Sequence, residues 1–219
     1  MKFFFNLVFV LILAKPVLSE VFETKYLIKN RGITIGLLTW KLDITEDNYT
    51  TVLTLEHKGF LSSLFPFNGK YRSVGKINNN HLFPNEYSQF WKTKNKERLV
   101  KITYENKKIK SLVLSPVENE APRIKYKLLE NYSDPLSSFL NILFNGEPSF
   151  TLDGRRSYKL SPTLKNKSIK ILIKQYTNIW ADHKRKDIEF IEIFTNKNSR
   201  LPEKINIMFG GTNFLLTKI

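Results

Sequence analysis

Short segments in which apolar and polar residues alternate recur along most of this sequence of 219 residues. The stretch 168–174 shows the pattern most clearly, because three isoleucines alternate there with lysine and leucine, as in a half-buried β-strand. Other strands are predicted at 22–28, 33–42, 49–55, 70–77, 86–93, 98–105, 109–114, 187–195, 204–209 and 213–218. Polar turns rich in asparagine separate them. Short strands at this spacing predict an antiparallel sheet, a sandwich or a partial barrel.

One segment, at about 135–144, breaks this pattern and is predicted to be an α-helix. Ser133 or Asp134 can cap its first turn, where Pro135 is also favoured. Gly146 follows its last turn and is typical of a helix end. A single amphipathic helix in a mainly β chain must bury its apolar side. We therefore expect a curved antiparallel sheet, or a partial barrel or sandwich, that packs this helix. The residues expected to be buried are Phe139, Leu140 and Leu143.

Residues 1–19 have the features of a signal peptide. Lys2 is followed by an apolar run to Ala14 that is too short to span a bilayer core of about 30 Å. Small or apolar residues precede a cleavage site after Ser19. We expect residues 20–219 to form a single β-rich domain that is exported, with no transmembrane anchor after cleavage.

The composition excludes several classes of function. The chain has no cysteine, which excludes disulfides, thiol nucleophiles and cysteine-based zinc sites. Its 3 histidines are widely spaced, so neither a metal nor another cofactor is expected. The net charge of +15 would suggest nucleic acid in a cytosolic protein, but the export signal and the lack of a nucleic-acid motif argue against this partner. The charge indicates either a solvated lysine-rich surface or attraction to anionic lipid headgroups or acidic glycans.

Four local patterns, in this order, resemble a known family. They are the strand and turn at 26–36, the apolar insert at 59–64, the helix start at 134–137 and the hairpin at 153–158. Together they resemble the exported bacterial proteins called domain of unknown function 3108. The resemblance implies a periplasmic, mainly antiparallel β domain, similar in shape to the half-barrels of bacterial lipoprotein carriers. It implies no established activity.

The hairpin at 153–158 supplies the candidate ligand-binding residues. These are Asp153, Arg155, Arg156 and Tyr158. A three-residue turn at 152–154 would pair Phe150 with Arg156, and would place Arg156 and Tyr158 on the packed side of the sheet. Arg155 would then be exposed and replaceable. A guanidinium on the packed side needs a carboxylate, such as that of Asp153, or a ligand anion.

Two functions fit these features. The first, which we favour, is a non-catalytic periplasmic binding or carrier module that holds an apolar or lipid-like ligand in the curved sheet over the helix. The second is an enzyme or sensor of acidic cell-envelope polysaccharide that uses the basic hairpin at 153–158. In that case Tyr158 would act as acid or base while the arginines neutralise a carboxylate. No nucleophile elbow, phosphate-binding loop or paired-histidine motif is present, so no catalytic residue is assigned.

Overall fold

The computed structural model describes residues 19–59, 66–181, 188–196 and 199–219. Nearly all of the predicted signal peptide and of the apolar insert therefore lies outside the described residues. In chain order, the strands are β1 (Glu20–Asn30), β2 (Ile33–Ile44), β3 (Asn48–His57), β4 (Phe67–Asn78), β5 (His81–Thr93), β6 (Glu97–Glu105), β7 (Lys108–Ser115), β8 (Tyr132–Ser133), β9 (Ser149–Leu152), β10 (Arg156–Lys165), β11 (Ser168–Asn178), β12 (Ile188–Phe194), β13 (Lys204–Phe209) and β14 (Thr212–Lys218). The helices are η1 (Tyr126–Leu128), a 3-10 turn, and α1 (Pro135–Asn145).

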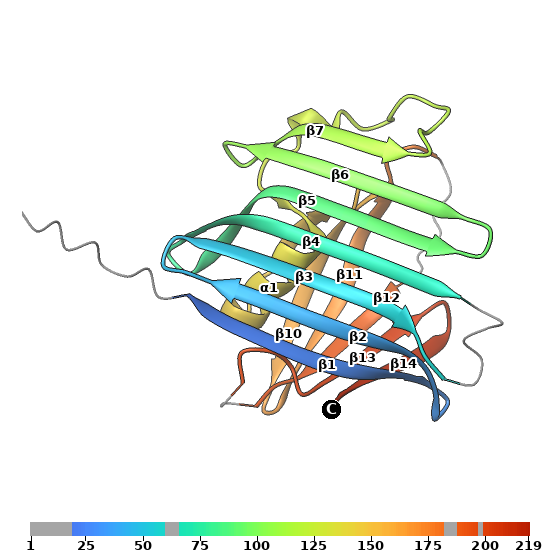
Figure 1. The fold of residues 1–219 in the computed structure, drawn as a ribbon. Coiled ribbons are helices and arrows are strands. Elements are labelled where there is room, and N and C mark those ends of the chain that lie inside the picture. Colours follow the sequence, from blue (N-terminus) through green and yellow to red (C-terminus); the bar gives the residue numbers. More distant parts are fainter. Residues whose placement is uncertain (1–18, 60–65, 182–187, 197–198) are drawn as a thin grey trace, which may run out of the picture.

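All of these strands join in one 14-stranded sheet that is bent into two layers. From β1 to β7 each strand pairs with the next, and β1 also pairs with β14, which continues through β13 to β9 and β8. Figure 1 shows β1–β7 as a broad front layer, with β10–β14 crossing behind it and α1 between them. An antiparallel bridge from Lys108 to Glu130, just before β8, brings the two ends of the sheet together. The mainly β fold with one enclosed helix, predicted from the sequence, is therefore confirmed.

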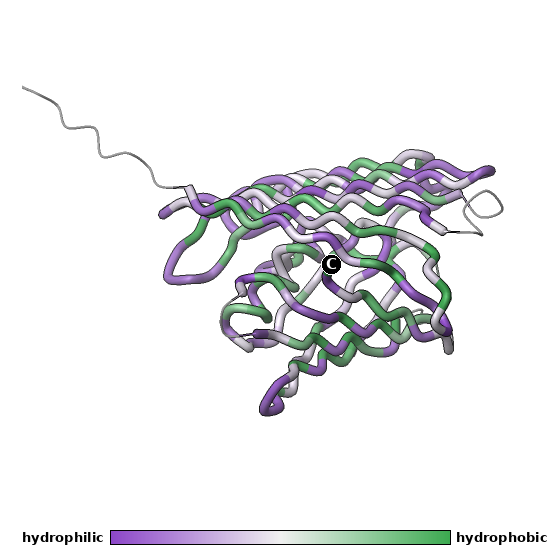
Figure 2. Tube along the Cα trace, turned by 60° about the horizontal axis from the view of Figure 1, so that its bottom comes forward, coloured by the Kyte–Doolittle hydropathy of each residue, from purple (hydrophilic) through white to green (hydrophobic). Residues whose placement is uncertain are grey.

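The alternation in the sequence places the apolar residues between the layers. In β2 the buried side chains are Leu38, Trp40 and Leu42, while Lys41 between them is exposed. In β11 Ile171 and Ile173 are buried in the same way. Figure 2 views the two layers close to edge-on, with their hydrophobic and hydrophilic residues interleaved along each strand.

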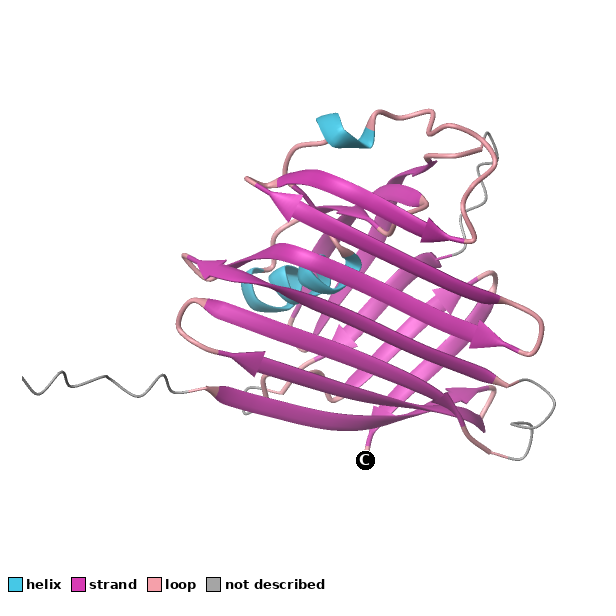
Figure 3. Cartoon of the chain, turned by 45° about the horizontal axis from the view of Figure 1, so that its top comes forward, coloured by secondary structure: helices cyan, strands magenta, loops and turns pink. Residues whose placement is uncertain are grey.

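Helix α1 begins and ends as the sequence predicts. The Asp134 carboxylate accepts hydrogen bonds from the backbone N–H groups at the helix start, and Gly146 ends the helix in a left-handed conformation with φ of 71°. Leu140 is fully buried in a cluster with side chains of β1–β3, β5, β13 and β14, while Ile142 is fully buried against β10–β12. Phe139 and Leu143 are only partly buried. Helix α1 lies between two layers and is therefore buried on two sides (Figure 3). From the sequence only one buried side was predicted, because a single apolar stripe was considered.

A buried polar cluster fixes α1 to the front layer. One carboxylate oxygen of Asp134 accepts hydrogen bonds from the hydroxyls of Ser73, at 2.8 Å, and Ser137, at 2.5 Å. The other oxygen accepts the backbone N–H groups of Leu136 and Ser137 at 2.9 and 3.1 Å. The Tyr49 hydroxyl lies 2.6 Å from that of Ser137. Strands β3 and β4 are thus connected to the first turn of the helix.

A second polar contact fixes the same helix turn to the opposite layer. The hydroxyl of Ser138 accepts hydrogen bonds from the hydroxyls of Thr151, at 2.8 Å, and Ser149, at 3.0 Å, both in β9. Ser138 and Thr151 are fully buried. Ser137 and Ser138, adjacent on α1, therefore connect the helix to both layers. Buried hydroxyl groups stabilise one orientation of the helix only when each of them has a hydrogen-bond partner.

The packing of α1 generates a stability prediction. Replacing the fully buried Leu140 with alanine should lower the free energy of unfolding by about 2–5 kcal/mol, because it leaves a cavity between the layers. Leu128, in η1 and 71% exposed, provides the control: Leu128→Ala should change the free energy by less than about 0.5 kcal/mol. Denaturant unfolding measures both. Equal effects of the two substitutions would contradict the position of α1 between the layers.

Candidate functional site

The hairpin at 153–158 has a different register from the one the sequence predicts. Leu152 pairs with Ser157, and Phe150 pairs with Lys159 rather than with Arg156. The loop thus contains four residues, and the predicted three-residue turn is wrong. The Asp153 carboxylate explains the difference, because it accepts the backbone N–H groups of Arg155 and Arg156 at 2.9 and 2.7 Å. Aspartate stabilises turns in this way through its own side chain.

The tip of this hairpin is packed against the front layer. Gly154 has a φ of 96°, and a Cβ added there would lie 2.4 Å from a methyl group of Val100 in β6. The indole N–H of Trp180 donates to the carbonyl of Gly154 at 3.0 Å. Glycine is therefore required for the close approach as well as for the turn. The hairpin closes one end of the space between the layers.

Arg155 is held inside this contact rather than exposed. Its Nε donates to a carboxylate oxygen of Glu118 at 2.6 Å, and its side chain is only 15% exposed. The prediction that Arg155 faces solvent is therefore wrong. The partner could not be predicted because Glu118 is 37 residues away in the sequence, and no local pattern connects it with the hairpin.

Arg156 and Tyr158 lie beside the same turn. The Arg156 side chain is 37% exposed, and one of its nitrogens lies 4.0 Å from the Asp153 carboxylate. Its guanidinium lies 5.9 Å from the ring centre of Tyr176, against which Tyr158 stacks at 6.2 Å. Burial, and then the charge of Asp153, raises the pKa of Tyr158 well above its ordinary value. Burial also raises the pKa of Asp153. The four predicted residues are thus close together, but a phenol that holds its proton so firmly is unsuited to act as a base.

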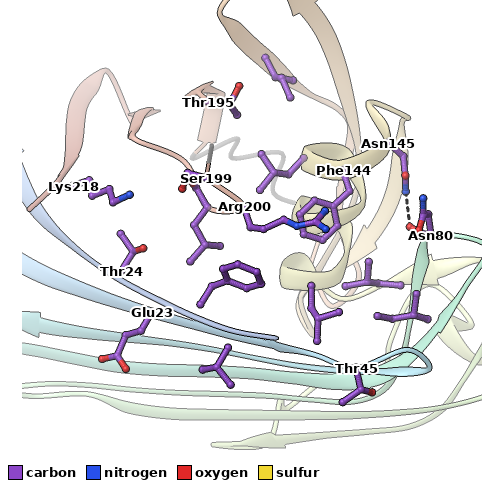
Figure 4. Close-up of a pocket in the computed structure, with 18 of the residues that line it drawn as sticks. Glu23, Thr24, Thr45, Asn80, Phe144, Asn145, Thr195, Ser199, Arg200 and Lys218 are labelled. Carbon is purple, nitrogen blue, oxygen red and sulfur yellow. Dashed lines mark hydrogen bonds between the residues drawn. The ribbon is translucent and has the colours of Figure 1, made fainter. Parts of the chain in front are cut away.

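A cleft lies at the other end of α1. It has a volume of about 870 Å³ and lies between β1 and the β2–β3 turn on one side and β11 and the β12–β13 connection on the other (Figure 4). The last turn of α1 lines its inner end. Its apolar lining residues are Val21, Phe22, Ile44, Ile77, Leu82, Leu143, Phe144, Ile169 and Leu201. Both layers and the helix therefore contribute hydrophobic surface to one opening, which we call the helix-end cleft.

Four charged side chains line the helix-end cleft. Glu23 forms an ion pair with Lys41 at 2.9 Å, and Lys218 forms one with Glu203 at 3.0 Å. Glu46 is exposed in the β2–β3 turn. Arg200 extends from the β12–β13 connection toward Phe144 (Figure 4), and no ion pair of its guanidinium occurs within the described residues. The carbonyl end of α1 favours a cation here.

A second cavity, of about 990 Å³, shares Ile77, Leu82 and Asn145 with the helix-end cleft. Asn141 lines the second cavity, and its amide accepts from the N–H of Leu82 at 2.8 Å and donates to the carbonyl of Leu82 at 2.9 Å. Asn145 donates to the carbonyl of Asn80 at 3.0 Å. The second cavity is lined by asparagines and by charges of both signs, together with the aromatic side chains of Phe83, Tyr104, Tyr132 and Phe150.

Neither the helix-end cleft nor the role of Arg200 in it could be predicted from the sequence. Its walls come from segments that are distant along the chain, and Arg200 follows a polar connection without a recognisable motif. In the parts of the chain that the structure describes, no group of three His, Asp or Glu side chains could hold a metal ion. Within the same residues, no helix combines the length and the apolar character needed to cross a membrane.

Comparison with known proteins gives a family and a fold. A family model described as "Protein of unknown function (DUF3108)" matches residues 25–160. No curated protein matches the sequence significantly. Among solved structures, the chain is similar to the crystal structure of a beta-barrel-like protein of domain of unknown function DUF1849 from Brucella abortus. The TM-score is 0.51 at 11% identity, over 93% of this chain and 96% of that one. This likeness supports a β-barrel-like fold.

The hairpin contact generates a prediction about coupling energy. In a double-mutant cycle, Arg155→Ala and Glu118→Ala should show a coupling of about 1–3 kcal/mol in the free energy of unfolding, because their short charged hydrogen bond is largely shielded from water. Lys92 and Glu97 form an exposed pair at 3.3 Å and serve as the control, with an expected coupling below about 1 kcal/mol. Similar coupling in both pairs would show that Arg155 is not held by Glu118 in solution.

Proposed function

Because the chain belongs to DUF3108, a family of proteins of unknown function, we propose its function from its cavities. We propose that it is a non-catalytic binding or carrier module of the periplasm. Its ligand is apolar or lipid-like, carries an anionic group, and occupies the helix-end cleft. The signal-peptide features of residues 1–19 support the location.

The observation that carries this proposal is the position of Arg200 in a cleft to which both layers and α1 contribute apolar side chains. Apolar side chains from both layers and α1 line the opening, while Arg200 extends across it (Figure 4). A guanidinium can donate two parallel hydrogen bonds to a carboxylate or a phosphate. The cleft thus provides hydrophobic surface for a hydrocarbon chain and a donor for one anionic group.

The volume of the helix-end cleft also supports the proposal. Small-molecule sites commonly enclose about 300–1,000 Å³, and this cleft measures about 870 Å³. The middle of the molecule is filled, since Leu140 and Ile142 of α1 are fully buried between the layers. We therefore place the ligand beside the last turn of α1 rather than over the whole helix.

The alternative function, action on acidic polysaccharide through the hairpin at 153–158, has less support. Arg155 is occupied by Glu118, and burial raises the pKa of Tyr158, which disfavours its action as a base. The peptide bonds of the hairpin tip are held by Asp153 and Trp180, so the turn serves the contact between the layers. No observation at this hairpin favours a sugar ligand.

Binding of a fluorescent long-chain fatty acid tests the proposed function. Arg200→Gln should weaken binding roughly 10- to 100-fold, because a charged hydrogen bond to the carboxylate is lost. Arg31→Gln removes the same charge from the β1–β2 turn, at the end of β1 far from the cleft, and should leave the affinity unchanged. Saturable binding by the unaltered protein that is insensitive to Arg200→Gln, or no binding at all, would contradict the proposal.

A further inference from the structure

The outer surface of β9–β13 is strongly basic. The side chains that point away from α1 alternate with buried ones such as Ile171, Ile193 and Ile205. In β10–β13, all of which the structure describes, the outward charged residues are Lys159, Lys165, Lys170, Lys174, Lys204 and Glu192, and Glu189 is exposed at the bulge near the start of β12. Glu192 lies 3.9 Å from Lys165 and accepts a hydrogen bond from Ser168. We call this surface the basic face.

Aromatic rings lie beneath the ammonium groups of the basic face. Lys170 lies 4.3 Å from the ring centre of Phe190, and Lys204 lies 4.1 Å from that of Phe194. At the β9 edge, Lys159 lies 5.3 Å from the ring centre of Phe150. Leu172, which pairs with Phe190, remains 37% exposed. The surface therefore combines positive charge with hydrophobic groups.

The outer surface of the front layer carries lysines that are paired with acids on the neighbouring strand or turn. Lys92 pairs with Glu97 at 3.3 Å, Lys101 with Glu86 at 3.1 Å and Lys110 with Glu105 at 3.1 Å. These three paired lysines are a matched set with which the lysines of the basic face can be compared.

We propose that the basic face docks on the surface of an anionic lipid bilayer. Lysines near such a surface are attracted by its negative potential, and aromatic and aliphatic side chains beside them enter the headgroup region. The basic face follows a sheet rather than a groove, which suits an extended charged surface. Its exposed apolar groups favour a bilayer over a soluble acidic polymer, which offers them no hydrocarbon.

The position of the helix-end cleft agrees with this docking. Lys165, Ser168, Phe194, Lys204 and Thr217 are cross-strand neighbours in one row of the sheet. The residues that follow Ser168 and Thr217, Ile169 and Lys218, line the cleft. Docking would therefore bring the mouth of the cleft close to lipid headgroups, from which a ligand could enter. This link rests on the proposed function, whereas the docking itself does not.

Co-sedimentation with vesicles tests the docking. The protein should bind vesicles that contain phosphatidylglycerol and not those of phosphatidylcholine alone, and high salt should release it. The triple variant Lys165→Gln, Lys170→Gln, Lys204→Gln should lose on the order of 100-fold in partitioning, because each lysine contributes about fivefold. The control variant Lys92→Gln, Lys101→Gln, Lys110→Gln has the same net charge and should lose little, since those lysines are paired.

Three results would overturn the docking proposal: no binding to anionic vesicles, equal losses in the two triple variants, or binding to soluble dextran sulfate without binding to vesicles. Fatty-acid binding in the absence of vesicles separates this proposal from the proposed function. Both triple variants should keep it, because none of the substituted lysines lines the helix-end cleft. Loss of vesicle binding with retained fatty-acid binding therefore shows that the basic face binds the bilayer independently of the helix-end cleft.

Discussion

The buried carboxyl group of Asp134 is the constraint on which the interior depends. It caps α1, and it also accepts hydrogen bonds from Ser73 of β4 and from Ser137 of the helix itself. A carboxyl group fully removed from water needs all of these partners, since a buried acceptor left without a donor is destabilising. The helix start and the front layer must therefore keep one relative position. Ser138 extends the same requirement to β9.

The filled interior follows from this position of α1. The helix lies between the layers, and its buried leucine and isoleucine side chains occupy the centre. At one end of the helix, the hairpin at 153–158 packs against β6 and closes the space. At the other end, the layers diverge around the last turn of α1 and leave the helix-end cleft. The same packing that stabilises the fold thus determines where a ligand can bind and which edge of the basic face lies beside it.

Features that depend on neighbouring residues could be predicted from the sequence. Alternation identified most of the strands, though not β8, β9 or β10. Asp134, Pro135 and Gly146 located α1, because capping acts within one helix turn. The family resemblance was also correct. Contacts between distant segments could not be predicted. The pairing of β1 with β14 and the ion pair of Arg155 with Glu118 join residues that are far apart in the sequence. No local sequence pattern indicates that these residues are in contact.

The error in the hairpin register has a local cause. The prediction considered which side chains would share a face of the sheet, and it ignored the Asp153 carboxylate as an acceptor for the backbone N–H groups of Arg155 and Arg156. Those two hydrogen bonds favour a four-residue loop. Arg200 was missed for another reason, since its neighbours in the helix-end cleft come from the opposite layer and from α1.

The pH dependence of unfolding tests the role of Asp134 most directly. Burial, opposed by hydrogen bonds from Ser137, Ser73 and Leu136, raises the pKa of this carboxyl above its ordinary value. The folded state therefore holds the proton more tightly than the unfolded chain, and stability from this group is lost as pH rises from about 4 through the raised pKa. Asp134→Asn keeps a capping residue without titrating. The free energy of unfolding of the unaltered protein, relative to that of Asp134→Asn, should fall as pH increases. A difference that stays constant or increases with pH would contradict a buried, proton-retaining Asp134 as the anchor of α1.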